Sequence, residues 1–416
     1  MEYGLIGEKL GHSFSKIIHN ELFSYEYELK EIKKEELDEF MKKAEFKAIN
    51  VTIPYKEAVI PYLDEISEKA RQIGAVNVVV NNGGFLSGYN TDYEGLKALI
   101  ERKKVDFKGK KVLILGSGGT SKTALAVSCD LGAVEVLRVS RKGGEGLITY
   151  EEAAQKMDTD IIINTTPLGM YPNIEGVAIC LDGFKKLSAV IDVVYNPLNT
   201  ELVTKAKQKG IKAFGGLYML VSQAVFAAEK FMGTKVLESE FQRVYKKILM
   251  EKRNLVLIGM PACGKTTIGK ALAKRLSKDF IDSDEQIVKK MGISIPEIFE
   301  KYGEEAFRKI ESEVIKEISA KQNVVIATGG GAVLNPRNTE LLKLNGIVCF
   351  INRPLEQLVG TKDRPLSQNK EMLKQRYEER FDIYTSSADF IIDAVFDIET
   401  NIKRVEEGFL NEDFGD

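Results

Sequence analysis

The strongest chemical signal in the sequence is a glycine-rich segment that could hold phosphate groups. Residues 259–266 read Gly-Met-Pro-Ala-Cys-Gly-Lys-Thr, which matches the whole pattern G-x-x-x-x-G-K-[ST]. In such a segment backbone N–H groups surround the phosphates, the lysine reaches the β and γ oxygens, and the threonine hydroxyl binds Mg²⁺. The segment follows an apolar run and precedes a helical pattern, as this mechanism requires. We therefore predict an ATP-binding loop made by Gly259, Ala262, Cys263, Gly264, Lys265, Thr266 and Thr267.

A second glycine-rich segment could hold a dinucleotide. Residues 116–121 read Gly-Ser-Gly-Gly-Thr-Ser, so serine replaces the third glycine of G-x-G-x-x-G. Sites specific for NAD usually carry an acidic residue at the end of the next strand, where it binds the ribose hydroxyl. This sequence has a serine and two cations there, which suit a 2′-phosphate. We predict that NADP(H) is bound by Gly116, Ser117, Gly118, Gly119, Thr120, Ser140, Arg141 and Lys142.

Two other dehydrogenase classes fit the sequence less well. Short-chain dehydrogenases need a Tyr-x-x-x-Lys spacing downstream of the glycine loop, and the spacing found here, Tyr93 to Lys97, lies upstream. The two histidines of the chain, His12 and His19, also precede that loop. A hydroxy-acid dehydrogenase that uses a histidine of the dinucleotide domain is therefore not expected.

The elements that must position these residues are those of an α/β protein. Between the glycine loop and residue 220, short apolar strands alternate with helical segments, which predicts a doubly wound parallel sheet. We expect its strands at 110–116, 134–139, 161–164 and 189–194. Near residue 250 the pattern of a strand followed by a glycine loop starts again, so the main domain boundary is predicted there.

The first 100 residues are predicted to form a separate α/β domain. Apolar runs bounded by Gly, Asn and Pro predict strands at 48–53 and 75–80. The charged segment 30–43 places Ile32, Leu37 and Met41 near helical spacing, which predicts an amphipathic surface helix.

Several motifs after residue 252 occur in an order that resembles shikimate kinase. Besides the phosphate loop they are 280–284 (Phe-Ile-Asp-Ser-Asp), 303–311 (Gly-Glu-Glu-Ala-Phe-Arg-Lys-Ile-Glu), 327–331 (Ala-Thr-Gly-Gly-Gly), 364–366 (Arg-Pro-Leu) and 380–384 (Arg-Phe-Asp-Ile-Tyr). The resemblance implies that Asp282 holds Mg²⁺ with Thr266. It also implies that Asp284 orients the attacking hydroxyl and that Arg364 closes on the transferring phosphate from a lid.

The same resemblance implies a site for the carboxylate of the substrate. Arg308 and Arg380 would clamp that carboxylate, because a guanidinium group can form paired hydrogen bonds with it. Gly330 and Gly331 would leave room for the ring and offer backbone N–H groups to it.

Seven segments of residues 1–250 resemble shikimate dehydrogenase in the order of that family. They are 11–20, 50–56 (Asn-Val-Thr-Ile-Pro-Tyr-Lys), 74–77, 88–92 (Gly-Tyr-Asn-Thr-Asp), 164–170 (Asn-Thr-Thr-Pro-Leu-Gly-Met), 195–197 and 220–224. The resemblance implies that Lys56 and Asp92 form the pair that moves the proton while hydride travels to or from the nicotinamide. It implies that substrate is bound by Ser13, Ser15, Thr52, Asn77, Asp92, Tyr195 and Gln223, and that Thr165 lies at the cofactor.

Together these observations predict a chain of three parts. We expect a substrate-binding domain over 1–100, completed by about 221–250, a Rossmann-type NADP domain over 101–220, and a P-loop kinase domain with a parallel sheet over 252–416. The predicted function is reduction of 3-dehydroshikimate to shikimate with NADPH, followed by phosphorylation of shikimate with MgATP. Two alternatives stay open: the dehydrogenase acts mainly on quinate, or one half has become a binding module without activity.

Composition limits the partners of the chain. The 416 residues are 44% hydrophobic and 29% charged, with a net charge of -2, so a nucleic-acid partner is not expected. No apolar run approaches the roughly 20 residues that span a bilayer, so we expect no membrane association. The N-terminal residues lack the features of a signal peptide and the four cysteines are scattered, which together predict a cytoplasmic enzyme that acts on small molecules.

Overall fold

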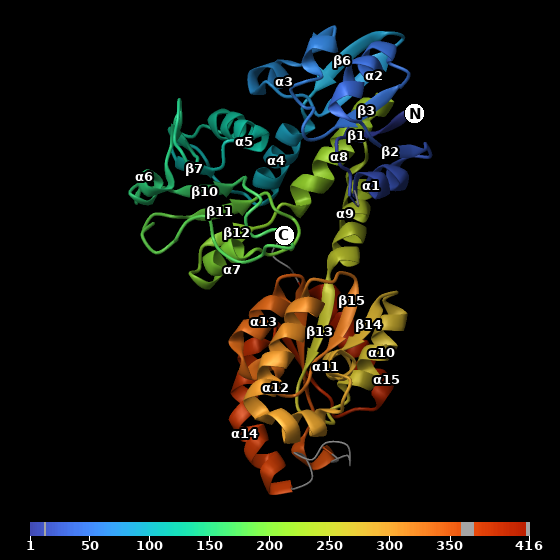
Figure 1. The fold of residues 1–416 in the computed structure, drawn as a ribbon, viewed down its shortest axis with the longest axis vertical. Helices are drawn as coiled ribbons and strands as arrows, with labels where there is room; N and C mark the ends of the chain where they lie inside the picture. The colour runs from blue at the N-terminus through green and yellow to red at the C-terminus, as the bar shows by residue number, and fades with distance from the viewer. Residues whose placement is uncertain (12–13, 359–369, 413–416) are drawn as a thin grey trace. The chain divides into compact units, whose positions relative to one another are not determined.

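The computed structural model describes residues 1–11, 14–358 and 370–412 and divides the chain into two compact units (Figure 1). The first unit is Met1–Leu249 and the second is Met250–Gly415. None of the helices in the described ranges is long and apolar enough to cross a membrane.

The first unit begins with a mixed sheet of six strands in the order β2-β1-β3-β5-β6-β4. Strand β5 runs antiparallel to both β3 and β6, and the other neighbours are parallel. The strands are β1 (Tyr3–Gly7), β2 (Tyr27–Glu31), β3 (Ala48–Val51), β4 (Glu65–Ile66), β5 (Val78–Asn82) and β6 (Phe85–Tyr89). Helices α1 (Phe14–Leu22), α2 (Leu37–Lys43) and α3 (Glu68–Ile73) and 3-10 turns η1 (Lys34–Glu36) and η2 (Ile60–Tyr62) connect them.

The predicted helix over 30–43 is wrong in its first half. Lys30 and Glu31 belong to strand β2, where they pair with the end of β1. The backbone N–H of Ile32 also donates to the carbonyl of Gly7 at 2.9 Å, and the regular helix begins at Leu37. Pairing with a strand that is distant in sequence therefore overrides the local helical pattern, as tertiary context often does.

The second sheet of this unit is the doubly wound parallel sheet that the sequence predicts. Its order is β12-β11-β10-β7-β8-β9, and every neighbouring pair is parallel. The strands are β7 (Lys111–Leu115), β8 (Glu135–Val139), β9 (Leu147–Ile148), β10 (Ile161–Asn164), β11 (Ala189–Asp192) and β12 (Lys212–Phe214). Helices α5 (Gly119–Asp130), α6 (Tyr150–Ala154) and α7 (Glu201–Gln208) lie between them.

Two helices join the sheets of the first unit. Helix α4 (Thr91–Arg102) leads from the first sheet to the second, and α8 (Leu217–Met232) returns and packs along α4 (Figure 1). Ala227 and Phe231 of α8 enter one hydrophobic core with Leu5 and Val78 of the first sheet. Helix α8 thus closes the first sheet although it follows the second sheet in sequence.

Helix α9 (Glu238–Lys252) contains the boundary between the two units. Within the first unit, Arg243 and Lys247 of this helix form ion pairs with Glu21 of α1 at 2.8 and 2.6 Å. Only Arg253 separates the end of α9 from the first strand of the second unit. The junction therefore contains no long irregular linker.

The second unit is built on a parallel sheet in the order β14-β15-β13-β16-β17. The central strand is β13 (Asn254–Ile258), and all five of its residues are buried. The other strands are β14 (Asp279–Asp282), β15 (Val324–Ala327), β16 (Gly346–Asn352) and β17 (Phe390–Asp393). The helices are α10 (Lys265–Arg275), α11 (Ser283–Met291), α12 (Ile295–Ser319), α13 (Pro336–Lys343), α14 (Lys370–Ser387) and α15 (Ile398–Asn411), with 3-10 turns η3 (Ala332–Leu334) and η4 (Leu355–Gln357).

Candidate active sites

An ion pair between Lys56 and Asp92 lies at the centre of the first candidate site. Lys56 follows strand β3, and Asp92 lies in the first turn of α4, whose start is capped by the side chain of Asn90. The Nζ and Oδ2 atoms are 2.5 Å apart, and the two side chains are 24% and 15% exposed. A part-buried amine in direct contact with a carboxylate can exchange a proton with a ligand bound beside it.

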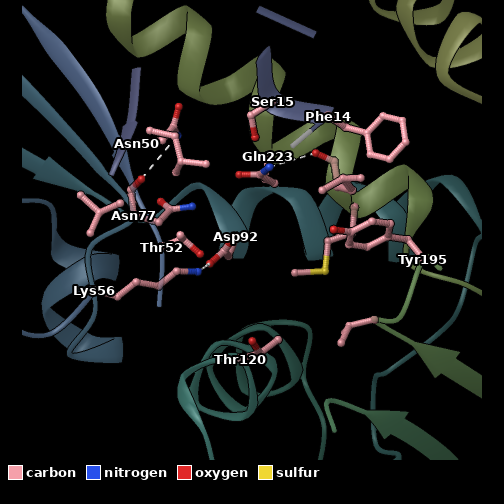
Figure 2. A pocket seen from close by; sticks show the side chains of 16 residues that line it. Phe14, Ser15, Asn50, Thr52, Lys56, Asn77, Asp92, Thr120, Tyr195 and Gln223 are labelled. Atoms are coloured by element: carbon pink, nitrogen blue, oxygen red, sulfur yellow. Dashed lines mark hydrogen bonds and ion pairs between the residues drawn. The ribbon is translucent and has the colours of Figure 1, made fainter. Parts of the chain in front are cut away.

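This pair opens into a cavity of about 270 Å³ (Figure 2). Loops and helices from both sheets of the first unit contribute to its wall, and Figure 2 shows polar side chains from several of them pointing into the same space. The wall contains seven of the residues predicted for catalysis or substrate binding, namely Ser15, Thr52, Lys56, Asn77, Asp92, Tyr195 and Gln223. Ser13 lies outside the described residues.

Hydrogen bonds hold several of these polar side chains in place. The Oδ1 atom of Asn77 accepts from the backbone N–H of Thr91 at 2.7 Å, and its Nδ2 atom contacts the Thr91 hydroxyl at 3.1 Å. Gln223 donates from Nε2 to the carbonyl of Leu220 at 3.1 Å. Tyr195 meets the edge of Phe14, with ring centroids 6.5 Å apart. The cavity therefore presents preorganised polar groups between apolar walls, as sites for small ligands do.

The predicted dinucleotide loop lies beside this cavity. Gly116 has a φ of 121°, and a Cβ atom there would lie 2.5 Å from the Thr165 hydroxyl oxygen, so only glycine fits. Thr165 itself donates to the carbonyl of Leu115 at 2.7 Å. Gly118 and Gly119 have open space beside them at the start of α5, where exposed N–H groups can bind a pyrophosphate. Thr120, in the first turn of α5, lines the cavity.

The residues predicted to select the cofactor follow the neighbouring strand. Strands β7 and β8 are parallel neighbours, so the turns after both lie at the same edge of the sheet. Arg141 and Lys142 are exposed there, and Ser140 donates its hydroxyl to the carbonyl of Gly143 at 3.1 Å. Ser117, after β7, is exposed at the same edge.

The phosphate-binding loop of the second unit follows its central strand. Gly259 and Gly264 have φ angles of 143° and 103°, and a Cβ atom on Gly259 would lie 2.6 Å from the carbonyl oxygen of Ile351. Lys265 is buried and donates from Nζ to the carbonyls of Gly259 and Met260 at 2.8 and 2.9 Å. Its ammonium group is therefore held inside the loop. Of the other predicted loop residues, Cys263 is buried, Ala262 is part-buried and Thr267 is exposed on α10.

A cation site can be assembled at the start of α10. The hydroxyl of Thr266 donates to Oδ2 of Asp282 at 2.8 Å, so the loop and the end of β14 bring two oxygen ligands together. Among the residues that the structure describes, no group of three His, Cys, Asp or Glu side chains could hold a metal ion. One hydroxyl and one carboxylate still fit Mg²⁺, which usually keeps waters and takes further ligands from phosphate oxygens.

Four charged side chains of the second unit meet at the glycine turn 329–331. A Cβ atom on Gly329 would lie 2.5 Å from Oδ1 of Asp284 and 3.1 Å from Oε1 of Glu311. A Cβ atom on Gly331 would overlap the guanidinium group of Arg308. Between these two glycines, the carbonyl of Gly330 accepts from Nη1 of Arg380 at 3.2 Å. The turn is thus lined by two arginines and two carboxylates. The predicted lid residue Arg364 lies outside the described residues.

Comparison with known proteins agrees with this geometry. Residues 5–79 match the family described as shikimate dehydrogenase substrate binding domain, and residues 261–406 match the family described as shikimate kinase. The chain is 40% identical over 264 residues to the NADP(+) shikimate dehydrogenase of Clostridium perfringens, covering 97% of that protein and 59% of this chain. The chain belongs to the shikimate dehydrogenase family and carries a shikimate kinase domain.

Solved structures support the assignment of the first unit. The chorismate mutase/shikimate 5-dehydrogenase fusion protein from Clostridium acetobutylicum is 37% identical, with a TM-score of 0.56, 59% of this chain covered and 96% of that one. Shikimate 5-dehydrogenase from Thermus thermophilus, solved with NADP(H) and shikimate, is 27% identical, with a TM-score of 0.53, 59% of this chain covered and 99% of that one. The predicted families, the α/β fold class and the pairing of an oxidoreductase with a kinase are confirmed.

The sequence did not single out Asp192, which links two loops of the dehydrogenase. This carboxylate is fully buried and accepts from Asn164 Nδ2 at 2.9 Å, Val194 N at 3.0 Å and Thr200 Oγ1 at 2.6 Å. It joins the loop of Thr165 to the loop of Tyr195. Burial raises the pKa of Asp192 to about 7, and its hydrogen bonds oppose that rise.

Two further residues of the sites had no predicted role. Asn50 lines the dehydrogenase cavity and accepts from the Tyr27 hydroxyl at 2.8 Å. Its position two residues before Thr52 in an extended segment is a signal that could have placed both on one face. In the kinase, Glu311 is 2% exposed and binds Arg308 at 2.8 Å, and burial raises the pKa of this glutamate while Arg308 opposes the rise. Its position three residues after Arg308 on α12 is the corresponding helical signal.

His19 is a packing residue of the described structure. It is fully buried, stacks on Tyr27 with ring centroids 4.2 Å apart, and its Nδ1 atom lies 2.5 Å from the Tyr25 hydroxyl. Burial lowers the pKa of its imidazole to about 3, so the ring stays neutral. It does not line the cavity that holds Lys56 and Asp92.

Proposed function

We propose that the first unit reduces 3-dehydroshikimate to shikimate with NADPH and that the second phosphorylates shikimate with MgATP to shikimate 3-phosphate. The observation that carries this proposal is the Lys56–Asp92 pair, 2.5 Å apart in a polar cavity that the dinucleotide helix α5 also lines. The kinase assignment rests on the phosphate loop and on the two arginines at the glycine turn.

In the dehydrogenase, the chain supplies a proton and orients the ring. The bound dinucleotide would supply the hydride to the carbonyl carbon. Lys56 would give a proton to the carbonyl oxygen as negative charge develops on it, and Asp92 would hold the ammonium group in place. Ser15 would bind the carboxylate of the substrate, with Ser13, while Thr52, Asn77, Tyr195 and Gln223 would bind the ring hydroxyls.

The choice of NADP(H) rests on charge. Arg141 and Lys142 are exposed after β8 and would pair with the 2′-phosphate, and Ser140 would add a hydroxyl. The pyrophosphate would lie on the N–H groups at the start of α5, after Gly116–Gly119. The name of the Clostridium perfringens relative includes NADP(+), and the Thermus thermophilus structure contains NADP(H), which supports this choice.

In the kinase, the chain positions the acceptor hydroxyl and neutralises charge. Arg308 and Arg380 would clamp the carboxylate of shikimate at the glycine turn, and Asp284 would accept a hydrogen bond from the attacking hydroxyl. Thr266 and Asp282 would hold Mg²⁺, which neutralises phosphate charge when bound. Lys265 would move from the loop carbonyls to the phosphate oxygens, and Arg364 would complete the site from the lid.

One experiment tests both halves in sequence. The purified chain is given 3-dehydroshikimate, NADPH and MgATP, and shikimate 3-phosphate is measured by mass spectrometry together with oxidation of NADPH. We expect shikimate 3-phosphate from the wild type, NADPH oxidation slowed at least about 100-fold in Lys56→Met, and accumulation of shikimate from Lys265→Met. Absence of shikimate 3-phosphate from the wild type would refute the proposal.

An assay of the dehydrogenase in the oxidation direction tests the quinate alternative. We expect a higher kcat/KM for shikimate than for quinate in the oxidation direction, and a higher value with NADP⁺ than with NAD⁺. A preference for quinate or for NAD⁺ would overturn the corresponding part of the assignment.

A further inference from the structure

Helix α5 reaches from the dinucleotide loop to the residues that follow Lys56 and Asp92. It begins at Gly119, directly after the glycine loop, and Thr120 in its first turn lines the same cavity as Lys56 and Asp92 (Figure 2). The helix packs against α3 and α4 of the first unit. Two polar contacts along it involve the residues that directly follow Lys56 and Asp92.

The first contact joins Tyr93 of α4 to Asp130 at the C-terminal end of α5. The hydroxyl of Tyr93 donates to Oδ2 of Asp130 at 2.6 Å, and Lys69 of α3 binds the same oxygen at 2.5 Å. Tyr93 is 7% exposed. Partial burial opposes ionisation of Asp130, but hydrogen bonds from Lys69 and Tyr93 hold the pKa of its carboxyl below the usual range. A charged acceptor of this kind makes the stronger class of hydrogen bond.

The second contact joins Glu57 to Lys122, in the first turn of α5. The carboxylate of Glu57 pairs with Nζ of Lys122 at 2.7 Å, and the two side chains are 60% and 38% exposed. An exposed pair of this kind contributes little to stability by itself. Its position still matters, because Glu57 is the residue that follows Lys56.

The covalent neighbours of the proton pair therefore bind one helix. Successive residues of a helix point about 100° apart, so Asp92 can face the cavity while Tyr93 faces α5. Lys56 and Glu57 share a peptide bond, so a shift of α5 moves the backbone that carries the lysine. Helix α5 thus begins at the dinucleotide site and contacts the residues next to both members of the proton pair.

We propose that α5 is a strut that sets the spacing of the Lys56–Asp92 pair against the bound dinucleotide, with Tyr93 and Glu57 as positioning residues. The inference rests on the proposed dehydrogenase activity of the same cavity. It has a thermodynamic consequence: the dinucleotide and the substrate both bind to elements held by α5, so each raises the affinity of the other by the same factor.

The test uses the full chain with Tyr93→Phe, Glu57→Gln and Asp130→Asn. Tyr93→Phe keeps the ring and removes only the hydroxyl, so packing is retained. We expect it to lower the kcat of shikimate oxidation by about tenfold, because small misplacements of reacting groups cost up to about a hundredfold. The KM values for shikimate and NADP⁺ should stay within about twofold. Asp130→Asn removes the charge of the acceptor and so weakens the same contact; it should also lower kcat, and the double variant should lose little more than Tyr93→Phe alone.

Matched controls come from a similar contact elsewhere in the first unit. Tyr62 donates to Asp38 at 3.0 Å, and Asp38 pairs with Lys42 at 2.8 Å, but none of these residues touches the cavity. Tyr62→Phe should leave kcat unchanged. Kinase turnover of shikimate by the same preparations reports the integrity of the second unit and should be unchanged in every variant.

Binding measurements give a readout that a purely structural role would not change. NADP⁺ and 3-dehydroshikimate are both oxidised and cannot react, so their mutual effect on affinity can be measured at equilibrium. We expect wild-type affinity for NADP⁺ to rise with 3-dehydroshikimate present, and this factor to fall toward one in the Tyr93→Phe/Glu57→Gln double variant.

The outcomes are distinguishable. A Tyr93→Phe variant with lower thermal stability but wild-type kcat and coupling would overturn the strut and leave Tyr93 a packing residue. An equal loss in Tyr62→Phe would also overturn it. If the wild type does not oxidise shikimate with NADP⁺, the proposed function fails before the strut is tested.

Discussion

Replacement of Lys56 by methionine is the most direct perturbation of the dehydrogenase. Methionine keeps most of the length of the side chain and removes the ammonium group that lies 2.5 Å from Asp92. The change leaves the cavity wall nearly intact, so the loss reports the chemistry of the amine.

The size of the effect follows from the geometry of the pair. At 2.5 Å and an effective dielectric constant of about 20, the attraction between the charges is roughly 7 kcal/mol before desolvation is subtracted. Lys56→Arg keeps this attraction but cannot give up a proton. Proton transfer by a positioned side chain is worth about 100-fold to 10,000-fold, or about 3–5 kcal/mol of activation free energy. We expect this loss of kcat in both the methionine and the arginine variants.

The assay is steady-state oxidation of shikimate by NADP⁺ with the full chain. Kinase activity in the same preparation is the internal control, and Lys47→Met, which removes an exposed pair with Glu2 at 3.0 Å, is the matched variant. More than about one tenth of wild-type kcat in Lys56→Met would refute the role of the amine. Activity in Lys56→Arg near that of the wild type would show that only the charge is needed.

Three further predictions concern the kinase turn and the buried loop network. Gly331→Ala places a methyl group against the guanidinium group of Arg308. The kinase KM for shikimate should therefore rise about tenfold while the KM for ATP stays unchanged. Equal changes in the two KM values would contradict the carboxylate site. Tyr384→Phe removes the hydroxyl that donates to the Gly330 carbonyl at 2.5 Å, and it should weaken shikimate binding by about 1 kcal/mol, measured by calorimetry. Tyr302→Phe, which changes an exposed tyrosine, is the control. Burial raises the pKa of Asp192 to about 7, so the folded state binds more protons than the unfolded one between about pH 4 and pH 7 and stability falls as pH rises through this range. Asp192→Asn should remove that dependence, so between about pH 5 and about pH 8 its stability should rise relative to the wild type by about 3 kcal/mol in denaturant unfolding of the dehydrogenase. An equal difference at both pH values would contradict this.

The local geometry of the two glycine loops could be predicted because it depends on neighbouring residues. Gly116 and Gly259 adopt positive φ angles that other residues avoid, and each follows a buried strand of a parallel sheet. The parallel sheets could also be predicted, because the alternation of strands and helices is a local pattern of neighbouring residues. The helix expected over 30–43 failed because its first residues are paired with β1, a contact that local periodicity does not encode.

The sequence by itself determined the residue types of both sites and the families that share them. Lys56 and Asp92 are recognisable from their motifs, but they are 36 residues apart, and only the fold brings their side chains into contact. Tertiary structure alone decided the partners of Asp192 and Tyr93. The physical reason is that each of these side chains is placed by packing between elements, and the free energy of such a contact depends on burial and distance that no local pattern contains.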